Sequence, residues 1–483
     1  MKPLSQTARP RGDQDDLKRF GYAQELFRSM GGFSNFAISF SIISILTGAV
    51  TLYGYGLEMG GPLEMTLGWP IATIFVLAIA ASMAELCSAY PTAGAMYHWA
   101  ADLGGPGCGW FVACFNIFGM MATLAGINYS CAQFVLPFLG ISASAFNLWA
   151  MFAAIMLGQG LINQYGVRLV AILNDVSVTV HIVGVVAIVA ALYFLAPQQP
   201  VHFLTLAVNS NGRSPYWWVF LLGLLQAHWT YTGFDASASM SEETHDARVR
   251  APWGIVLSVA VSGVVGYLLL LGMTLSIQSL PAVLGAKDPQ GNAIPAAITV
   301  FRQALGDRFG NLMGALAAIA MWFCGLSCIT SSSRTLFSLA RDNGTPRSAW
   351  LRHVNPKHGT PGPAIWVIVV ASLAAMAWGG AVPTVTSFGT VAQYVAYITP
   401  VILAFRARWT RPGWTSEAVW TLGRYGAVIN AVAIVYTVGI CFILVMPPND
   451  LAGKSVLGLF GGLSLLYIFH TRKAYKGPEW SKS

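Results

Sequence analysis

Twelve apolar segments constrain this chain more than any other feature of its sequence, because each is close to the ~20 residues that a helix needs to cross a bilayer. Backbone polar groups inside a bilayer must find partners within the protein, so such segments fold as helices. The 55% hydrophobic and 10% charged content excludes an ordinary water-soluble globule. The sequence therefore predicts an all-α integral membrane protein with 12 transmembrane helices, at 33–57, 69–90, 109–138, 147–164, 168–196, 216–240, 253–279, 311–338, 363–380, 384–405, 425–446 and 453–470.

The basic residues are distributed unevenly between the two sides of this arrangement. With the N-terminus in the cytoplasm, 22 of the 27 Lys and Arg residues lie on the cytoplasmic side and 5 lie outside. This follows the positive-inside rule and accounts for the net charge of +8 without a nucleic-acid partner. The polar residues before the first segment lack the short apolar core of a signal peptide. We expect a multi-pass protein of the cell membrane with both termini in the cytoplasm.

The sixth segment, 216–240, is interrupted in its middle. Residues 230–233 read TYTG, a run of poor helix formers that ends in a glycine, and Asp235 follows at once. A carboxylate at membrane depth is costly, which favours a functional site. The alternative is a kinked helix whose second half is capped by Asp235. The two interpretations are compatible, because a cap at a broken helix exposes backbone groups that a ligand can use.

The first segment has a similar interruption, which we place at Thr47-Gly48-Ala49. Interruptions in the first and sixth segments are five segments apart, as two inverted five-helix repeats with a site between them require. We therefore expect four regions: a cytoplasmic tail 1–32, a ten-helix core 33–405, two additional helices 406–470 and a cytoplasmic tail 471–483.

Two charged residues stand out at the expected cytoplasmic ends of helices. Glu85, at the end of the second segment, is expected to pair with a cytoplasmic arginine and to stabilise a gate rather than contact substrate. Arg334, at the end of the eighth segment, is suited to intracellular ion pairs or to lipid phosphate. The sequence contains no metal-ligand set, nucleophile–base pair or phosphate loop, so we expect no enzyme activity, no metal and no cofactor.

The chain resembles the amino acid–polyamine–organocation (APC) superfamily of secondary transporters, and within it the amino acid/choline permeases. The resemblance covers nearly the whole chain. It implies a five-plus-five inverted-repeat fold with broken helices 1 and 6, alternating access, and substrates such as amino acids, 4-aminobutyrate, choline or polyamines. Four stretches carry it: LTGAVTLYGYGL (46–57), AELCSAYPTAGAMYHW (84–99), GFDASASMSEET (233–244) and SSSRTLFSLARDNGTP (331–346).

In such a fold, a zwitterionic substrate lies between the two breaks. Its carboxylate would accept hydrogen bonds from amides in the first break, and its ammonium would face carbonyls in the sixth. Trp229 and Tyr231 would cover it or make cation–π contacts; the alternative for Trp229 is an ordinary core aromatic. The Ser44 and Thr47 hydroxyls would bind it or bond to their own helix. The expected substrate-binding residues are Ser44, Thr47, Gly48, Ala49, Trp229, Thr230, Tyr231 and Gly233.

Two carboxylates are candidates for coupling transport to an ion. A carboxyl in a dry site favours its protonated form, as a proton carrier requires, and Asp235 has that position. Asp175, on the fifth segment, is the second candidate. The superfamily places sodium or a cationic side chain near this segment, whereas this sequence has Asn174 and Asp175, so the coupling ion stays open. His181, nearby, either relays protons or satisfies a neighbour.

Sodium is the alternative coupling ion. Ser327, Thr330 and Ser331 on the eighth segment offer oxygen atoms for it, or form only helix–helix hydrogen bonds. The leading hypothesis is a proton-driven symporter, or an exchanger, for an amino acid or related amine. The alternatives are a choline or polyamine carrier and a nutrient sensor, and the short tails argue against the sensor.

Overall fold

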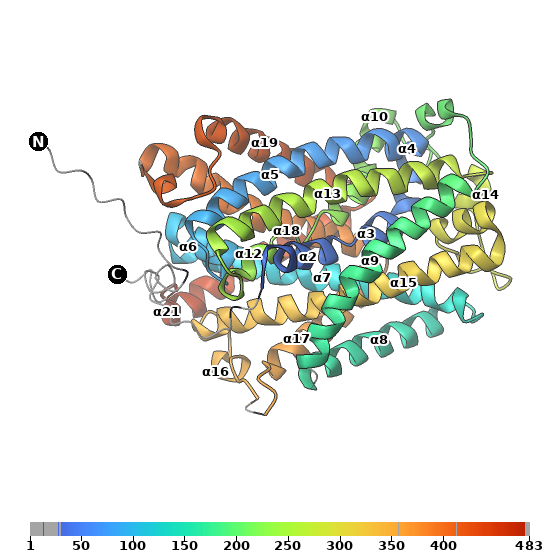
Figure 1. Cartoon of the computed structure of the whole chain (residues 1–483). Helices are drawn as coiled ribbons and strands as arrows, with labels where there is room; N and C mark the ends of the chain where they lie inside the picture. The colour runs from blue at the N-terminus through green and yellow to red at the C-terminus, as the bar shows by residue number, and fades with distance from the viewer. Residues whose placement is uncertain are drawn as a thin grey trace, which may run out of the picture.

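The computed structural model describes Asp13, Arg28 and residues 30–165, 167–355, 357–411 and 413–478. The side chains of six residues in these ranges are not described: Val167, Arg168, Ala171, Asn174, Asp175 and Glu417. Within the described part the chain is a bundle of helices, and its only β-pairings are isolated bridges. Figure 1 shows α6, α16 and α21 at one end of this bundle, here called the α21 end, and α4, α10 and α14 at the opposite end, here called the α4 end.

The first half of the chain supplies the helices around the first break. A π-helical turn, η1 (Glu64–Gly68), joins α4 to α5. The helices are α2 (Gly32–Ile43), α3 (Ile45–Thr51), α4 (Tyr53–Leu63), α5 (Trp69–Ala89), α6 (Ala95–Gly104), α7 (Pro106–Phe138), α8 (Ala145–Tyr165) and α9 (Val167–Phe194).

The second half begins with a 3-10 turn, η2 (Val201–Thr205), and with three short helices where the sixth segment was predicted. The helices are α10 (Tyr216–Gly223), α11 (Leu225–Thr230), α12 (Ala236–Ser239), α13 (Ala247–Leu275), α14 (Leu280–Leu284), α15 (Ala296–Arg341), α16 (Ser348–Leu351), α17 (Gly362–Gly379), α18 (Val382–Thr410), α19 (Gly426–Leu444), α20 (Asp450–Leu466) and α21 (Arg472–Ala474).

In the described part of the chain, eleven helical stretches are long and apolar enough to cross a membrane. The predicted segment 216–240 is not among them, because it is divided into α10, α11 and α12. The predicted segment 311–338 is the second half of the longer α15, in which Gly306 has a φ of +76° and marks a bend. The all-α membrane class is therefore confirmed, and the count of twelve and the inverted repeat stay predictions.

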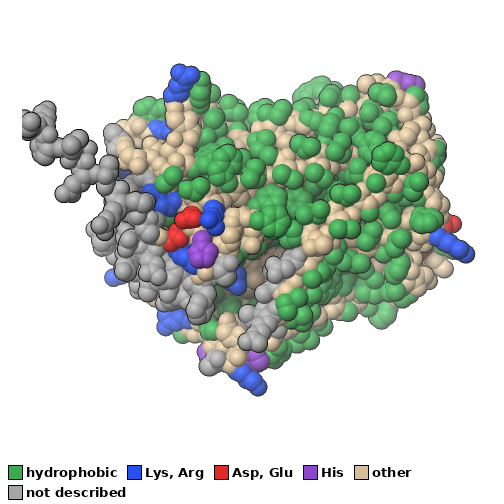
Figure 2. Space-filling model, in the orientation of Figure 1, with side chains coloured by type: hydrophobic (Ala, Val, Ile, Leu, Met, Phe, Trp, Pro, Cys, Tyr) green, Lys and Arg blue, Asp and Glu red, His purple; other side chains and the backbone are tan. Residues whose placement is uncertain are grey.

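The surface between the two ends of the bundle is apolar. Figure 2 shows hydrophobic side chains over the middle of the visible face, with charged side chains gathered toward the ends. Large exposed side chains in this region come from helices on the outside of the bundle, including Val186, Val435 and Leu457. A bilayer solvates such a surface, so these side chains need no protein partner.

The centre of the bundle is α7, which packs against α15 and α18. Around it, small residues let helices approach closely. Trp69 on α5 is 1% exposed, and its indole N–H donates to the carbonyl of Gly263 on α13 at 2.9 Å. A Cβ atom at Gly266, one turn further on, would lie 2.3 Å from the same indole ring. The α5–α13 contact therefore depends on a glycine at position 266.

We expect Gly266→Val to destabilise the protein by about 2 kcal/mol, because the rigid buried indole cannot move away from the new side chain. Thermal unfolding in detergent measures the loss. Gly439→Val on α19 is the matched control, since a Cβ atom there meets nothing within 4 Å. Equal effects of the two substitutions would contradict the packing argument.

Candidate functional site

The sixth segment breaks where the sequence predicts. Helix α11 ends at Thr230, residues 231–235 are not helical, and α12 begins at Ala236. Gly233 has a φ of +92°, which L side chains rarely adopt. A Cβ atom at Gly233 would also lie 2.2 Å from Cγ2 of Ile42, near the end of α2. Only glycine fits here, and its absent side chain lets the two broken segments pack together.

The first segment breaks three residues earlier than predicted. Ser44 has left-handed backbone angles (φ 39°, ψ 81°) and separates α2 from α3, whereas Thr47, Gly48 and Ala49 lie inside α3. The amides of Thr47 and Gly48 donate to the Ser44 carbonyl at 2.7 and 2.9 Å. The expectation that these two amides are free is therefore wrong, because the turn at Ser44 itself supplies their acceptor.

The side chain of Ser44 is held by the fifth segment. His181 Nδ1 lies 2.7 Å from the Ser177 carbonyl oxygen, so Nδ1 carries the hydrogen. In the neutral ring, Nε2 then accepts from the Ser44 hydroxyl at 2.7 Å. The Thr47 hydroxyl, 2.5 Å away, completes the chain by donating to Ser44. His181 thus belongs to the first break, a placement that only the fold reveals.

The two broken segments touch directly. A Cβ atom at Gly48 would lie 2.5 Å from Thr230 side-chain atoms and 2.6 Å from its Cα. Gln226 Nε2 donates to the Ala49 carbonyl at 3.1 Å, and the Thr230 hydroxyl donates to the Gln226 carbonyl at 2.7 Å. The structure thus brings the predicted residues of both segments together, in a contact that leaves no room for a ligand between Gly48 and Thr230.

Asp235 is buried in the sixth break, with 4% of its surface exposed. It occupies the N-cap position of α12, but its side chain makes no capping hydrogen bond. Instead, the Tyr397 hydroxyl lies 2.8 Å from Asp235 Oδ1 and 2.9 Å from Gln393 Oε1, and it accepts the Gly233 amide at 2.8 Å. Sequence reasoning missed Gln393 and Tyr397; their only signal is two polar residues four apart on one apolar helix.

Two aromatic residues flank this break. Tyr231 is fully buried, with its ring 4.8 Å from that of Trp69 and its hydroxyl 2.5 Å from Thr73 Oγ1. Trp229 is 2% exposed, and its indole N–H has no hydrogen-bond partner among the described residues. A buried donor without an acceptor is costly, so the Trp229 N–H is a candidate donor to an acceptor that the described residues do not supply.

The candidate coupling residues outside the break differ in what they contact. Asp175 lies on α9, but its side chain and that of Asn174 fall outside the described part. The Thr330 hydroxyl donates to Asn163 Oδ1 on α8 at 2.6 Å, and the Ser327 hydroxyl donates to the Phe323 carbonyl at 3.0 Å. Ser331 is 6% exposed on the same helix. Among the described residues, no group of three or more His, Cys, Asp or Glu side chains is arranged to hold a metal.

Both predicted gate residues form ion pairs. Glu85, 1% exposed, pairs with Arg408 at the end of α18 and accepts the Leu422 amide at 3.0 Å. Arg408 also donates to Asn430 Oδ1 at 2.8 Å. Arg334 Nη1 lies 3.4 Å from Glu243 Oε1, just beyond α12. The Arg334 pair therefore joins α15 to the end of the broken sixth segment.

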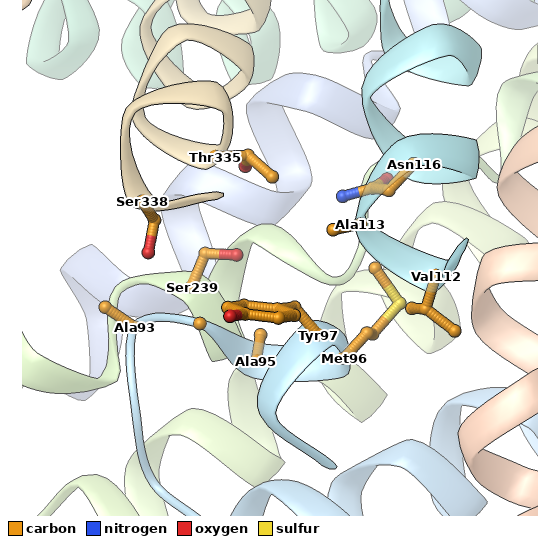
Figure 3. Close-up of a pocket in the computed structure, with 11 residues that line it drawn as sticks. Ala93, Ala95, Met96, Tyr97, Val112, Ala113, Asn116, Ser239, Thr335 and Ser338 are labelled. Carbon is orange, nitrogen blue, oxygen red and sulfur yellow. The ribbon is translucent and has the colours of Figure 1, made fainter. Parts of the chain in front are cut away.

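A small cavity of about 20 Å³ lies beside these elements, where Asn116, Ser239, Thr335 and Ser338 meet the turn before α6 (Figure 3). Asn116 is 6% exposed, and its side-chain oxygen has no partner among the described residues. Nearby, burial and then the charge of Arg341 lower the pKa of His98 to about 3, so this ring is neutral at physiological pH. The space suits a single water molecule.

Comparison with known proteins adds independent information. The family described as amino acid permease matches residues 30–468. The chain is 34% identical to an amino-acid permease BAT1 homolog of Oryza sativa subsp. japonica, over 96% of this chain and 94% of the relative. It is 31% identical to the amino-acid permease BAT1 of Arabidopsis thaliana, over 96% and 95%. It is 26% identical to a GABA-specific permease of Saccharomyces cerevisiae, over 98% and 86%.

We expect Glu85→Gln to destabilise the protein by about 3 kcal/mol, because it leaves the mostly buried Arg408 guanidinium without its counter-charge. Chemical unfolding in detergent measures this loss. The control is Asp450→Asn, whose exposed pair with Lys454 contributes less than about 1 kcal/mol. If Glu85→Gln is as mild as the control, the pair does not hold α5 to α18.

Proposed function

The chain belongs to the amino acid permease family of the APC superfamily, whose members are transporters rather than enzymes, and from this membership we propose that it moves an amino acid or related amine, such as 4-aminobutyrate, across the cell membrane. Transport proceeds by alternating access and is driven by protons or by exchange. The GABA-specific relative supports 4-aminobutyrate as one substrate to test.

The observation that carries the proposal is the contact of the two breaks beside an unpartnered indole. Gly48 and Thr230 touch, and the Trp229 N–H one residue away lacks an acceptor among the described residues. A substrate carboxylate that separates the breaks would accept that N–H. The substrate ammonium would face the last carbonyls of α11, where in the closed arrangement the Trp229 carbonyl accepts from Thr232 and the His228 carbonyl accepts from the Tyr394 hydroxyl. Ser44, Tyr231 and Gly233 shape the same space.

Proton coupling is assigned to Asp235. The buried carboxyl has one hydroxyl partner and no positively charged partner among the described residues, so its burial favours the protonated form when the break is closed. Release of this proton would follow when the break opens to water. Asp175 is the second coupling candidate. Sodium at Ser327, Thr330 and Ser331 is the alternative, which the hydrogen bonds of Ser327 and Thr330 make less favourable.

The rest of the proposed architecture follows from the same family. Residues 33–405 form a ten-helix inverted-repeat core, and 406–470 add two helices outside it. The tails 1–32 and 471–483 lie in the cytoplasm, as the distribution of Lys and Arg supports. This places the α21 end inside the cell. The Glu85 and Arg334 ion pairs then act as cytoplasmic gates.

The transport test is uptake into proteoliposomes from a panel of 4-aminobutyrate, neutral and cationic amino acids, choline and putrescine. We expect accumulation of a carboxylate-bearing substrate under an inward proton gradient, or its exchange against internal substrate. The same panel under a sodium gradient tests the alternative ion. Uptake confined to choline or putrescine would contradict the carboxylate site and would favour the alternative permease.

We expect Asp235→Asn to reduce gradient-driven accumulation on the order of tenfold or more, equivalent to about 1.4 kcal/mol or more, because the amide cannot exchange a proton. Substrate exchange at equal pH on both sides should persist. Asp246→Asn is the control, since Asp246 is exposed and its ion pair among the described residues is with Arg250. Accumulation that keeps its wild-type pH dependence in Asp235→Asn would remove this residue from the coupling mechanism.

A further inference from the structure

Glu64 is a buried carboxyl that the proposed mechanism does not use. It is the first residue of η1, at the α4 end of the bundle, and it is 1% exposed. Neither of its carboxyl oxygens has a hydrogen-bond partner among the described residues, and none of the ion pairs there includes it. Buried carboxyls are ordinarily hydrogen-bonded or paired with a cation, so this arrangement needs a physical explanation.

Three glycines make the space that the Glu64 side chain occupies. A Cβ atom at Gly68 would lie 2.5 Å from both carboxyl oxygens, and one at Gly223, the last residue of α10, would lie 2.8 Å from Cγ. A Cβ atom at Gly60 on α4 would lie 2.5 Å from Cβ of Glu64. The backbone of α4, η1 and α10 therefore encloses the carboxyl, and it does not reach water.

The titratable groups around Glu64 supply no neutralising charge. Tyr216 donates its hydroxyl to the Gly60 carbonyl at 2.7 Å. The Tyr436 hydroxyl lies 2.9 Å from Nε2 of His228, whose Nδ1 donates to the Leu224 carbonyl, so Tyr436 is the donor to the neutral imidazole. Among the described residues, the neighbouring elements and loop also carry Tyr53, Tyr55, Glu58, His202, Tyr267 and Arg213 at this end, and no ion pair joins Arg213 to Glu64. The helix α13 also carries Arg248 and Arg250, but in its first turn, where Arg250 pairs with Asp246.

We infer that Glu64 is a proton-binding site, occupied by a proton in this conformation and emptied when α10 moves away from η1. An ionised carboxylate without a partner would be strongly disfavoured here, whereas the neutral acid is tolerated. The step is the simple equilibrium in which the carboxylic acid gives its proton to water and becomes a carboxylate. The inference rests on the proposed transport function only for the movement of α10, not for the bound proton.

Glu64 packs against α10, the first helix of the broken sixth segment, and the same segment carries the buried carboxyl of Asp235. Gly223 at the end of α10 packs on Glu64, whereas Asp235 lies beyond the end of α11. Between them, His228 on α11 bonds to Tyr436, and the Tyr394 hydroxyl donates to the His228 carbonyl at 3.3 Å. A displacement of α10 and α11 thus changes the surroundings of both carboxyls, so one motion acts on two protons.

The test is infrared spectroscopy of the purified full chain at neutral pH, which detects the carbonyl stretch of a protonated carboxyl. We expect this band in the wild type and its selective loss in Glu64→Gln. Glu58→Gln is the matched control, because Glu58 is exposed on α4, six residues earlier, and the band should persist there. An unchanged carboxylic-acid region in Glu64→Gln would overturn the inference, since Glu64 would then be ionised and neutralised by a cation.

A second variant covers the case in which Glu64→Gln does not fold. Glu64→Asp keeps the carboxyl but shortens it, so its carbonyl band should be displaced from the wild-type position; an unmoved band would overturn the inference. Transport is then read separately. Wild-type proton-driven uptake in Asp235→Asn with the Glu64 band intact would overturn the proposed coupling alone, whereas absence of the Glu64 band with proton-driven uptake intact would overturn only the second proton site.

Discussion

Every break in a membrane-spanning helix leaves amide and carbonyl groups that must find partners inside the protein, and this constraint shapes the centre of the molecule. At the first break, the Ser44 carbonyl accepts two amides, and the Ser44 hydroxyl bonds to His181 on a different helix. At the second, Tyr397 accepts the Gly233 amide and contacts Asp235. The first break satisfies its own backbone while α9 holds the Ser44 side chain, and the second takes a backbone partner from α18, so the surrounding helices help to hold both breaks.

Three of the buried carboxyls near these breaks and helix ends differ in how far they are satisfied. Glu85 has an arginine and a backbone amide. Asp235 has one tyrosine hydroxyl, and Glu64 has no partner among the described residues. Since a buried charge needs a counter-charge and hydrogen bonds, this order also ranks the carboxyls by how readily each exists as an anion. The paired carboxylate suits a structural clamp, and the other two suit reversible protonation.

Much of the fold could be predicted from apolar length and helix-breaking residues. The interruption before Asp235 was predictable because residues 230–233 are poor helix formers and end in a glycine. The first break was misplaced because Gly48 marks it in sequence, whereas the left-handed residue is Ser44, and a serine there gives no such signal. Gly48 is instead a contact glycine for Thr230. The partners Arg408, Tyr397 and His181 depend on helices distant in sequence, and Glu64 resembled an ordinary loop carboxylate.

The Gly48–Thr230 contact also bears on how the proposed substrate site would discriminate between ligands. Two surfaces that already touch hold no preformed slot, so any ligand that enters between them must act as a wedge. Its net affinity is the difference between the contacts it gains and the helix contact it breaks. The thickness of the ligand then becomes a criterion for recognition in addition to its charge. A thin, unbranched chain separates the half-helices least, whereas a bulky side chain must displace more of the packed bundle to occupy the same place.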